Sequence, residues 1–222
     1  MTKTKIASWL AMPVAAAALA ACTVGGGSAA AGTDYDAMTA KVAKESFQDK
    51  GIAKVERLKQ DEANRLCSAA DVAGKPLDES SAKMLEAAQM KTIQWPSDGK
   101  FLGNWEAGEE VAQSGKGETW RDKAGDVNGG NCYNCHQLTK EEISFGTIGP
   151  SLYNYGKLRG VTDPNSAAAQ EVVKYTWGKL YNARAYSACS LMPRFGHNGI
   201  LKEQQLKDIM ALLLDPKSPV NQ

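Results

Sequence analysis

The most reactive arrangement in the sequence is the pentapeptide Cys-Tyr-Asn-Cys-His at residues 132–136. Two thiols at this spacing can each add to one of the two vinyl groups of a porphyrin, and the histidine that follows can bind the iron on one face of the ring. The sequence therefore predicts one covalently attached haem c, held by Cys132 and Cys135, with His136 as an iron ligand.

Three other chemistries use two cysteines at this spacing. A thioredoxin-like dithiol needs a βαβ setting, and no strand pattern of any length is present. A structural zinc ion needs two further ligands at paired spacing, and the chain has only two histidines. A disulfide between Cys132 and Cys135 would be strained and is uncommon. Haem attachment is favoured because it needs neither a βαβ setting nor further metal ligands nor a strained bond.

A haem that transfers electrons needs a second axial ligand. Met192 lies in a polar, turn-rich Met-Pro-Arg loop before the last predicted helix, which is a poor place for a methionine that only fills a core. Its thioether suits iron, and Met/His ligation raises the reduction potential. We predict Met192 as the second ligand, with His197 as the alternative, and count Arg194 of the same loop among the residues that contact the cofactor.

A Gly-Pro pair follows the pentapeptide at residues 149–150. A loop carbonyl can accept the Nδ1–H of an iron-ligating imidazole, which fixes the tautomer and makes the ligand more basic. We predict that the Pro150 carbonyl does this for His136. Taken alone, a Gly-Pro pair indicates only a turn.

The N-terminus predicts export. Two lysines precede an apolar stretch at residues 6–20, which is too short to span a bilayer and is followed by small residues. We expect a signal peptide at residues 1–21, a flexible tether at residues 22–33 and a periplasmic location. The end of the signal is similar to a lipobox, which makes Cys22 a candidate for lipidation and a membrane anchor. Cleavage at an Ala-x-Ala site instead, at residues 18–20 or near 29–31, stays open.

The five cysteines can then be assigned. If haem takes two and lipid takes Cys22, then Cys67 and Cys189 remain as an even pair in an oxidising compartment. We predict a disulfide between them that pins the N-terminal helices beside the Met192 loop. The alternative is a reactive thiol at one of the two positions.

The periodicity of apolar residues predicts a mostly α-helical protein. The region from residue 34 to 103 reads as a helical extension, too poor in apolar residues to fold confidently alone, with a helix at residues 52–58 and another from residue 80. Three further segments are predicted as helices, and they lie at residues 105–113, 164–186 and 202–214, separated by loops at 139–155 and 189–199.

Composition narrows the function classes. The 222 residues carry 26 Lys plus Arg against 25 Asp plus Glu, a net charge of +1. So neutral a chain is a poor candidate for binding nucleic acid by bulk charge, and we expect no nucleic-acid partner. No acid–base or nucleophile constellation is apparent, so the chain is expected to act through its cofactor and not as a catalyst of its own.

The order of helix, pentapeptide, Gly-Pro loop, helix, Met-Pro loop and helix resembles the class I cytochrome c fold, which implies a cytochrome domain at residues 104–222. Three segments also resemble the SoxX family of small cytochrome c subunits. They are Gly-Gly-Asn-Cys-Tyr-Asn-Cys-His at 129–136, Gly-Thr-Ile-Gly-Pro-Ser-Leu at 146–152 and Leu-Met-Pro-Arg-Phe-Gly-His-Asn-Gly-Ile-Leu at 191–201.

That resemblance implies a place in a heterodimer. The family's partner is the larger SoxA cytochrome, and the SoxAX complex joins thiosulfate to a cysteine of the SoxYZ carrier, the L-cysteine S-thiosulfotransferase reaction. The resemblance implies that this chain accepts electrons and passes them to a soluble cytochrome c, with His136 and Met192 as the axial pair. The alternative is a free-standing periplasmic cytochrome c without an enzymatic partner.

Overall fold

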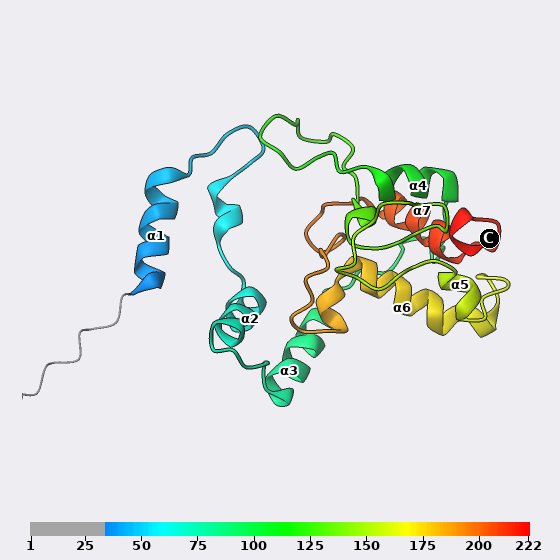
Figure 1. The fold of residues 1–222 in the computed structure, drawn as a ribbon, viewed down its shortest axis with the longest axis horizontal. Coiled ribbons are helices and arrows are strands. Elements are labelled where there is room, and N and C mark those ends of the chain that lie inside the picture. The colour runs from blue at the N-terminus through cyan, green and yellow to red at the C-terminus, as the bar shows by residue number, and fades with distance from the viewer. Residues whose placement is uncertain (1–33) are drawn as a thin grey trace, which may run out of the picture. The chain divides into compact units, whose positions relative to one another are not determined.

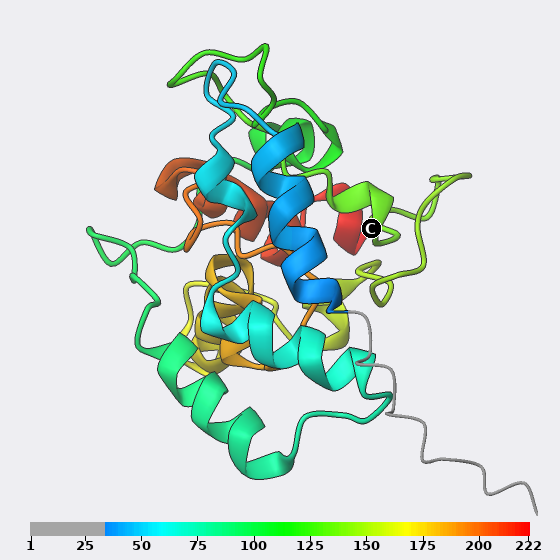
Figure 2. The same ribbon diagram turned by 90° about the vertical axis from the view of Figure 1, so that its left-hand side faces the viewer.

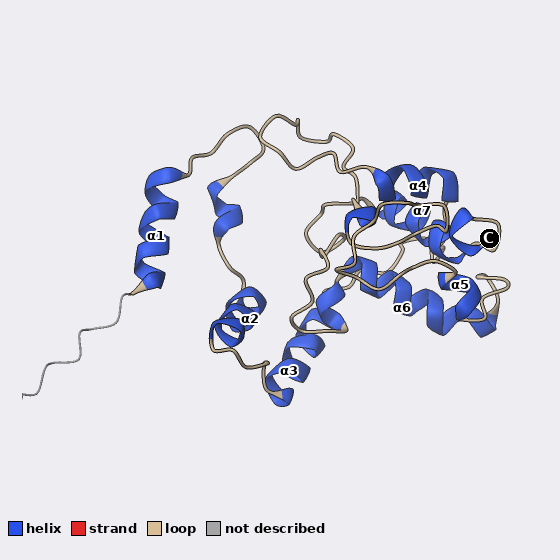
Figure 3. Cartoon of the chain, in the orientation of Figure 1, coloured by secondary structure: helices blue, strands red, loops and turns tan. Residues whose placement is uncertain are grey.

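The computed structural model describes residues 34–222, and this part of the chain is helical (Figures 1 and 3). It contains no strand, only an isolated bridge between Lys50 and Ala53. The α-helices are α1 (Tyr35–Ser46), α2 (Glu62–Val72), α3 (Glu79–Met90), α4 (Trp105–Gln113), α5 (Tyr155–Leu158), α6 (Gln170–Tyr181) and α7 (Glu203–Leu214). Short 3-10 helices are η1 (Val55–Leu58), η2 (Cys132–Asn134), η3 (Ala167–Ala169), η4 (Ala183–Ala185) and η5 (Pro219–Asn221). The predicted mostly-α class is confirmed.

Contacts between residues divide the chain into two compact units, with the boundary between Val42 and Ala43. All features described below belong to the second unit, which ends at Gln222. The predicted boundary between residues 103 and 104 falls inside this unit and stays a prediction. The predicted signal peptide, the tether and Cys22 lie outside the described residues. Within residues 34–222, no helix is both long and apolar enough to cross a membrane.

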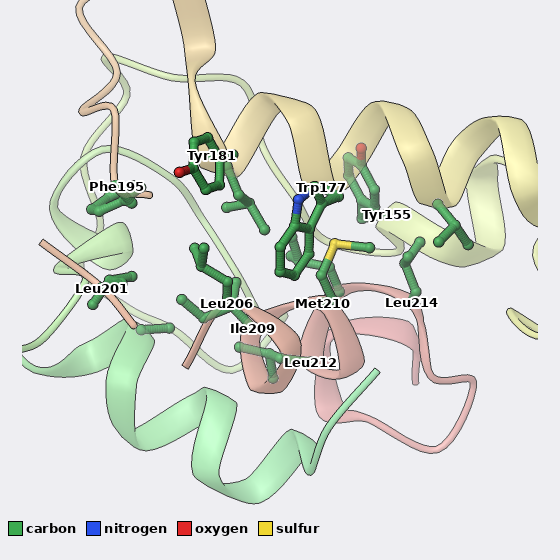
Figure 4. Close-up of a cluster of buried hydrophobic side chains, with 14 of the residues drawn as sticks. Tyr155, Trp177, Tyr181, Phe195, Leu201, Leu206, Ile209, Met210, Leu212 and Leu214 are labelled. Carbon is green, nitrogen blue, oxygen red and sulfur yellow. The ribbon is translucent and has the colours of Figure 1, made fainter. Parts of the chain in front are cut away.

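Helix α7 is the centre of the fold. Every residue from Gln205 to Leu214 is buried, and helices α4, α5 and α6 all pack against it (Figure 4). Around it lies the main core, a continuous cluster to which all these helices and the loops before α7 contribute. Its members include Tyr155, Trp177, Tyr181, Phe195, Leu201, Leu206, Ile209, Met210, Leu212 and Leu214. A helix buried on nearly all sides needs partners for its polar residues as well as its apolar ones.

Besides Glu203 and Gln204 of α7 itself, the segment before α4 supplies polar partners for this helix. The buried Lys207 places its Nζ 2.8 Å from a carboxylate oxygen of Asp98. Asp208 accepts a hydrogen bond of 2.9 Å from the backbone N–H of Asn104, the residue that caps α4. These contacts hold the start of α4 against α7.

The sequence predicted α4 and α7 to within a residue, whereas the helix predicted at residues 52–58 is wrong. Only the single turn η1 forms there. The preceding residues form a tight turn in which Lys50 and Ala53 exchange backbone hydrogen bonds, and Asp49 accepts the N–H of Val55 at 2.8 Å. The turn uses backbone groups that a longer helix would need.

The long helix predicted at residues 164–186 is also interrupted. Its regular part is α6, and the chain becomes extended at Asn182, with φ −148° and ψ 93°. The buried Asn182 amide donates to Gln89 Oε1 and to Thr92 Oγ1, both at 2.9 Å. Hydrogen bonds to the last turn of α3 and to Thr92 just after it therefore end the helix where local propensity would continue it. The sequence also missed α5, a single turn at the end of an expected loop.

Close approach of α4 to α7 requires a glycine. Gly108 is buried on α4, and a Cβ added there would overlap the backbone carbonyl of Asp208 and the backbone nitrogen of Ile209. The obstruction is helix backbone, which cannot rotate away as a side chain does.

We predict that Gly108→Ala destabilises the protein. Alanine gains about 1 kcal/mol of helix propensity over glycine. Overpacking against a rigid backbone outweighs that gain, so the free energy of unfolding should fall by about 2 kcal/mol net. Chemical unfolding measures this, with Glu110→Ala on the exposed side of the same helix as the control. A Gly108→Ala protein as stable as the control would show that the helices do not cross at Gly108.

Candidate functional site

The pentapeptide folds as a tight turn. Cys132 to Asn134 form η2, and the backbone N–H groups of Cys135 and His136 both donate to the Cys132 carbonyl, at 3.0 and 2.9 Å. Asn131, just before the turn, has a left-handed backbone with φ 49°, a conformation that asparagine tolerates better than most residues. The turn brings the two cysteines and the histidine into one short segment.

Helix α4 holds the chain that leads into this turn. The Val111 carbonyl accepts the N–H of Gly130 at 2.7 Å, and the Ser114 carbonyl accepts the N–H of Asn131 at 2.9 Å. Carbonyls at the end of α4, which have no partner within the helix, are thus used to anchor the pentapeptide.

The imidazole of His136 is held in one orientation. Its Nδ1 lies 2.6 Å from the Pro150 carbonyl oxygen, the contact predicted from the sequence. Because a carbonyl can only accept, Nδ1 carries the proton, and in the neutral ring Nε2 keeps a lone pair that a metal can use.

The Gly-Pro loop is bonded to the pentapeptide through its backbone as well. Gly149 donates to the Cys135 carbonyl at 2.8 Å, and Leu152 donates to the Gln137 carbonyl at 2.8 Å. Gly149 lies so close to the His136 ring that a Cβ would overlap the imidazole. The loop and the ring therefore form one closely packed unit, and a side chain at position 149 would displace the histidine.

The two thiols of the pentapeptide are free, and the disulfide that the sequence allowed between Cys132 and Cys135 is not formed. Cys132 packs against the main core, and burial raises the pKa of its thiol to about 12. A thiol with so high a pKa is almost fully protonated at neutral pH and is a poor nucleophile in water. Among the residues that the structure describes, no group of three or more His, Cys, Asp or Glu is arranged to hold a metal ion.

Met192 is brought to the same core as Cys132 and Leu152, although it lies far along the chain. The neighbouring Leu191 is 87% exposed, so the loop runs at the surface while Met192 turns inward. His197, the alternative ligand, is an exposed residue whose backbone N–H donates to the Tyr181 carbonyl at 3.0 Å. Partial burial of the ring and then the charge of Arg194 lower the pKa of His197.

Arg194 is buried, with 8% of its surface exposed. Its guanidinium lies 2.5 Å from a carboxylate oxygen of Asp61 and donates to Gln89 Oε1 at 3.3 Å. A second arginine, Arg184, lies 3.6 Å from the other Asp61 oxygen. The structure thus pairs Arg194 with residues of the N-terminal helices, and its contact with a cofactor stays a prediction.

The predicted disulfide between Cys67 and Cys189 is confirmed, with the two Cα atoms 5.4 Å apart. A small second core surrounds it, formed by Ala63 of α2, Leu85 of α3 and Ala188 of the later loop. Figures 1 and 2 show α3 beside η4, the turn that precedes this loop.

The sequence did not identify Asp61, Gln89 or Arg184 as part of this region. An Asp followed by Glu at a helix start is a recognisable cap signal, and Asp61 does cap α2 by accepting the N–H of Asn64 at 2.7 Å. Nothing local indicates that its other contacts lie 133 residues away, on Arg194.

No family model matches the chain. A curated relative, an uncharacterized lipoprotein of Aquifex aeolicus (strain VF5), is 40% identical over 131 residues, which cover 59% of this chain and 58% of that protein. The chain thus spans little more than half of that relative's length.

We predict that Cys67→Ser/Cys189→Ser lowers the free energy of unfolding by about 3–5 kcal/mol. The bond joins residues 122 apart, and closure of so long a loop removes much entropy from the unfolded chain. Denaturant unfolding measures this, and reduced wild-type protein is the matched control, which should unfold at the midpoint of the variant. Equal midpoints for oxidised wild type and variant would contradict the prediction.

Proposed function

We propose that this chain is a monohaem c-type cytochrome that transfers electrons. The observation that carries the proposal is the His136 Nδ1 contact with the Pro150 carbonyl, beside two free thiols in the same turn. An oriented imidazole with its second nitrogen available is what an axial ligand requires. In the same turn, two unpaired cysteines provide the attachment chemistry.

The residues present fit a haem. Cys132 and Cys135 would hold it covalently, and His136 would bind its iron through Nε2. When bound, the haem supplies reversible one-electron chemistry at its iron. Pro150 keeps the imidazole proton on Nδ1, and Cys132 packs against the main core.

Met192 is the proposed second ligand. It packs against the same core as Cys132 from a distant part of the chain, and its thioether would be the second donor to the iron. A thioether on this face favours the reduced iron and raises the potential, which suits an acceptor of electrons.

We place the chain in the class I cytochrome c fold and near the SoxX family, on the sequence segments that contain these residues. The proposed partner is a SoxA-type cytochrome in a heterodimer, with transient contacts to the SoxYZ carrier and to an acceptor cytochrome c. In this arrangement the chain passes on electrons and catalyses no bond formation itself.

The relative described as a lipoprotein supports an exported, lipid-anchored protein. Together with the lipobox-like residues before Cys22, it favours lipidation of that cysteine and a periplasmic location, and the confirmed disulfide suits an oxidising compartment.

Haem attachment tests the proposal directly. In cells that can mature c-type cytochromes, the wild-type chain should keep haem through denaturing electrophoresis, and Cys132→Ser/Cys135→Ser should lose it entirely. Cys67→Ser/Cys189→Ser is the matched control, with the same residue types changed elsewhere, and should keep its haem. Wild-type protein without covalent haem would refute the proposal.

Replacing Met192 tests the second ligand. Met192→Ala should abolish the weak red absorption band that a methionine ligand gives ferric haem, because the sulfur–iron bond is lost. His197→Ala should keep the band. Persistence of the band in Met192→Ala, or its absence from the ferric wild-type protein, would show that Met192 does not bind the iron.

Purification from the native source separates this function from that of a free-standing carrier. A SoxA-type partner predicts a stable heterodimer with a second cytochrome, whereas a free-standing carrier predicts a monomer at the same ionic strength. The mass of the mature N-terminus in the same preparation reports whether Cys22 carries lipid.

A further inference from the structure

The loop that contains Met192 has little structure of its own. It forms no regular helix between η4 and α7, its neighbours Leu191 and Pro193 are exposed, and the backbone N–H of Met192 is bonded only locally, to Ser190 Oγ at 3.2 Å. Loops with few internal contacts open at low free-energy cost. Something outside the loop must restrain it if Met192 is to stay in place.

The first restraint lies just before Met192. Cys189 is bonded to Cys67 of α2, and the neighbouring Ala188 is buried in the small core between α2 and α3. The backbone N–H of Ala188 also donates to Glu86 Oε1 of α3 at 3.0 Å.

The second restraint lies just after Met192. The buried Arg194 forms its ion pair with Asp61 at the start of α2 and bonds to Gln89 of α3. Burial opposes ionisation of Asp61, but the Asn64 N–H and the Arg194 guanidinium outweigh it, so the pKa of Asp61 lies below its ordinary value and the pair is charged at neutral pH. A buried guanidinium that lost this carboxylate would be costly, so the contact resists opening of the loop.

We infer that α2 and α3 position the iron-ligating loop, and that Asp61 is a positioning residue for Met192. The inference rests on the proposed function, because it concerns the bond between Met192 and a bound haem iron. Contacts on both sides of Met192, from one pair of helices, reduce the fraction of time in which the thioether leaves the iron. They do so without any contact of the helices with the iron itself.

Imidazole competition measures that fraction. Exogenous imidazole binds ferric haem only when the methionine is displaced, so its apparent affinity is proportional to the open fraction of the loop. The experiment titrates imidazole into ferric holoprotein at pH 7 and follows the loss of the red methionine band.

Asp61→Asn is the informative variant because asparagine keeps the N-cap of α2 and removes the charge. Asp78→Asn is its matched control: Asp78 caps α3 in the same way, accepting the N–H of Ser81 at 3.0 Å, and forms no ion pair with any residue in the described range 34–222. Cys67→Ser/Cys189→Ser removes the other restraint independently.

The expected result is an imidazole affinity raised about tenfold in Asp61→Asn and in the serine variant, with Asp78→Asn within about twofold of wild type. A structural role alone would lower the unfolding midpoint but leave imidazole affinity unchanged. Unchanged affinity in both Asp61→Asn and the serine variant, with the methionine band intact, overturns this inference and leaves the proposed function standing. Wild-type protein without covalent haem, or without a methionine band, would contradict both this inference and the proposed function.

Discussion

The burial of α7 is the constraint on which the rest of the described structure depends. A helix enclosed along its length cannot leave polar groups without partners, and Lys207 and Asp208 find theirs in the segment just before α4. That requirement brings α4 across α7 at Gly108, where the backbones touch. The end of α4 then offers its last carbonyls to the residues before Cys132. The position of the pentapeptide is therefore set by the packing of α7.

The Met192 loop is held to the same helix, α7, through different contacts. Helix α6 packs on α7, and its Trp177 is buried between them while its indole N–H donates to the Gln94 carbonyl at 2.9 Å. Phe195 and Leu201, which follow Met192, enter the main core beside α7 (Figure 4). Because both halves share one rigid core, Met192 and Cys132 are held near it despite the length of chain that separates them.

The sequence was most informative where the determining contacts are local. The pentapeptide, the Pro150 contact, α4 and α7 all depend on spacings of at most 14 residues or on simple periodicity. The Cys67–Cys189 bond was found by counting, which needs no geometry. The break at Asn182 and the pairing of Asp61 with Arg194 could not be found, because in each case the deciding partner lies some 90 to 130 residues away. A polar residue in a sequence does not indicate which distant group it will meet.

The two faces of the proposed haem site are thus held by contacts of different range. On the histidine face the hydrogen bonds to the pentapeptide come from the end of α4 and from the Gly-Pro loop, and Cys132 packs against the main core. On the methionine face Phe195 and Leu201 anchor the loop in the main core, and a disulfide and an ion pair join it to α2 and α3, which have only a small core of their own. Those helices gain stability from the loop that they hold, and the loop gains its order from them. Because α2 and α3 each bury a single residue, Ala63 and Leu85, these helices depend on the disulfide and the ion pair for their place beside the loop.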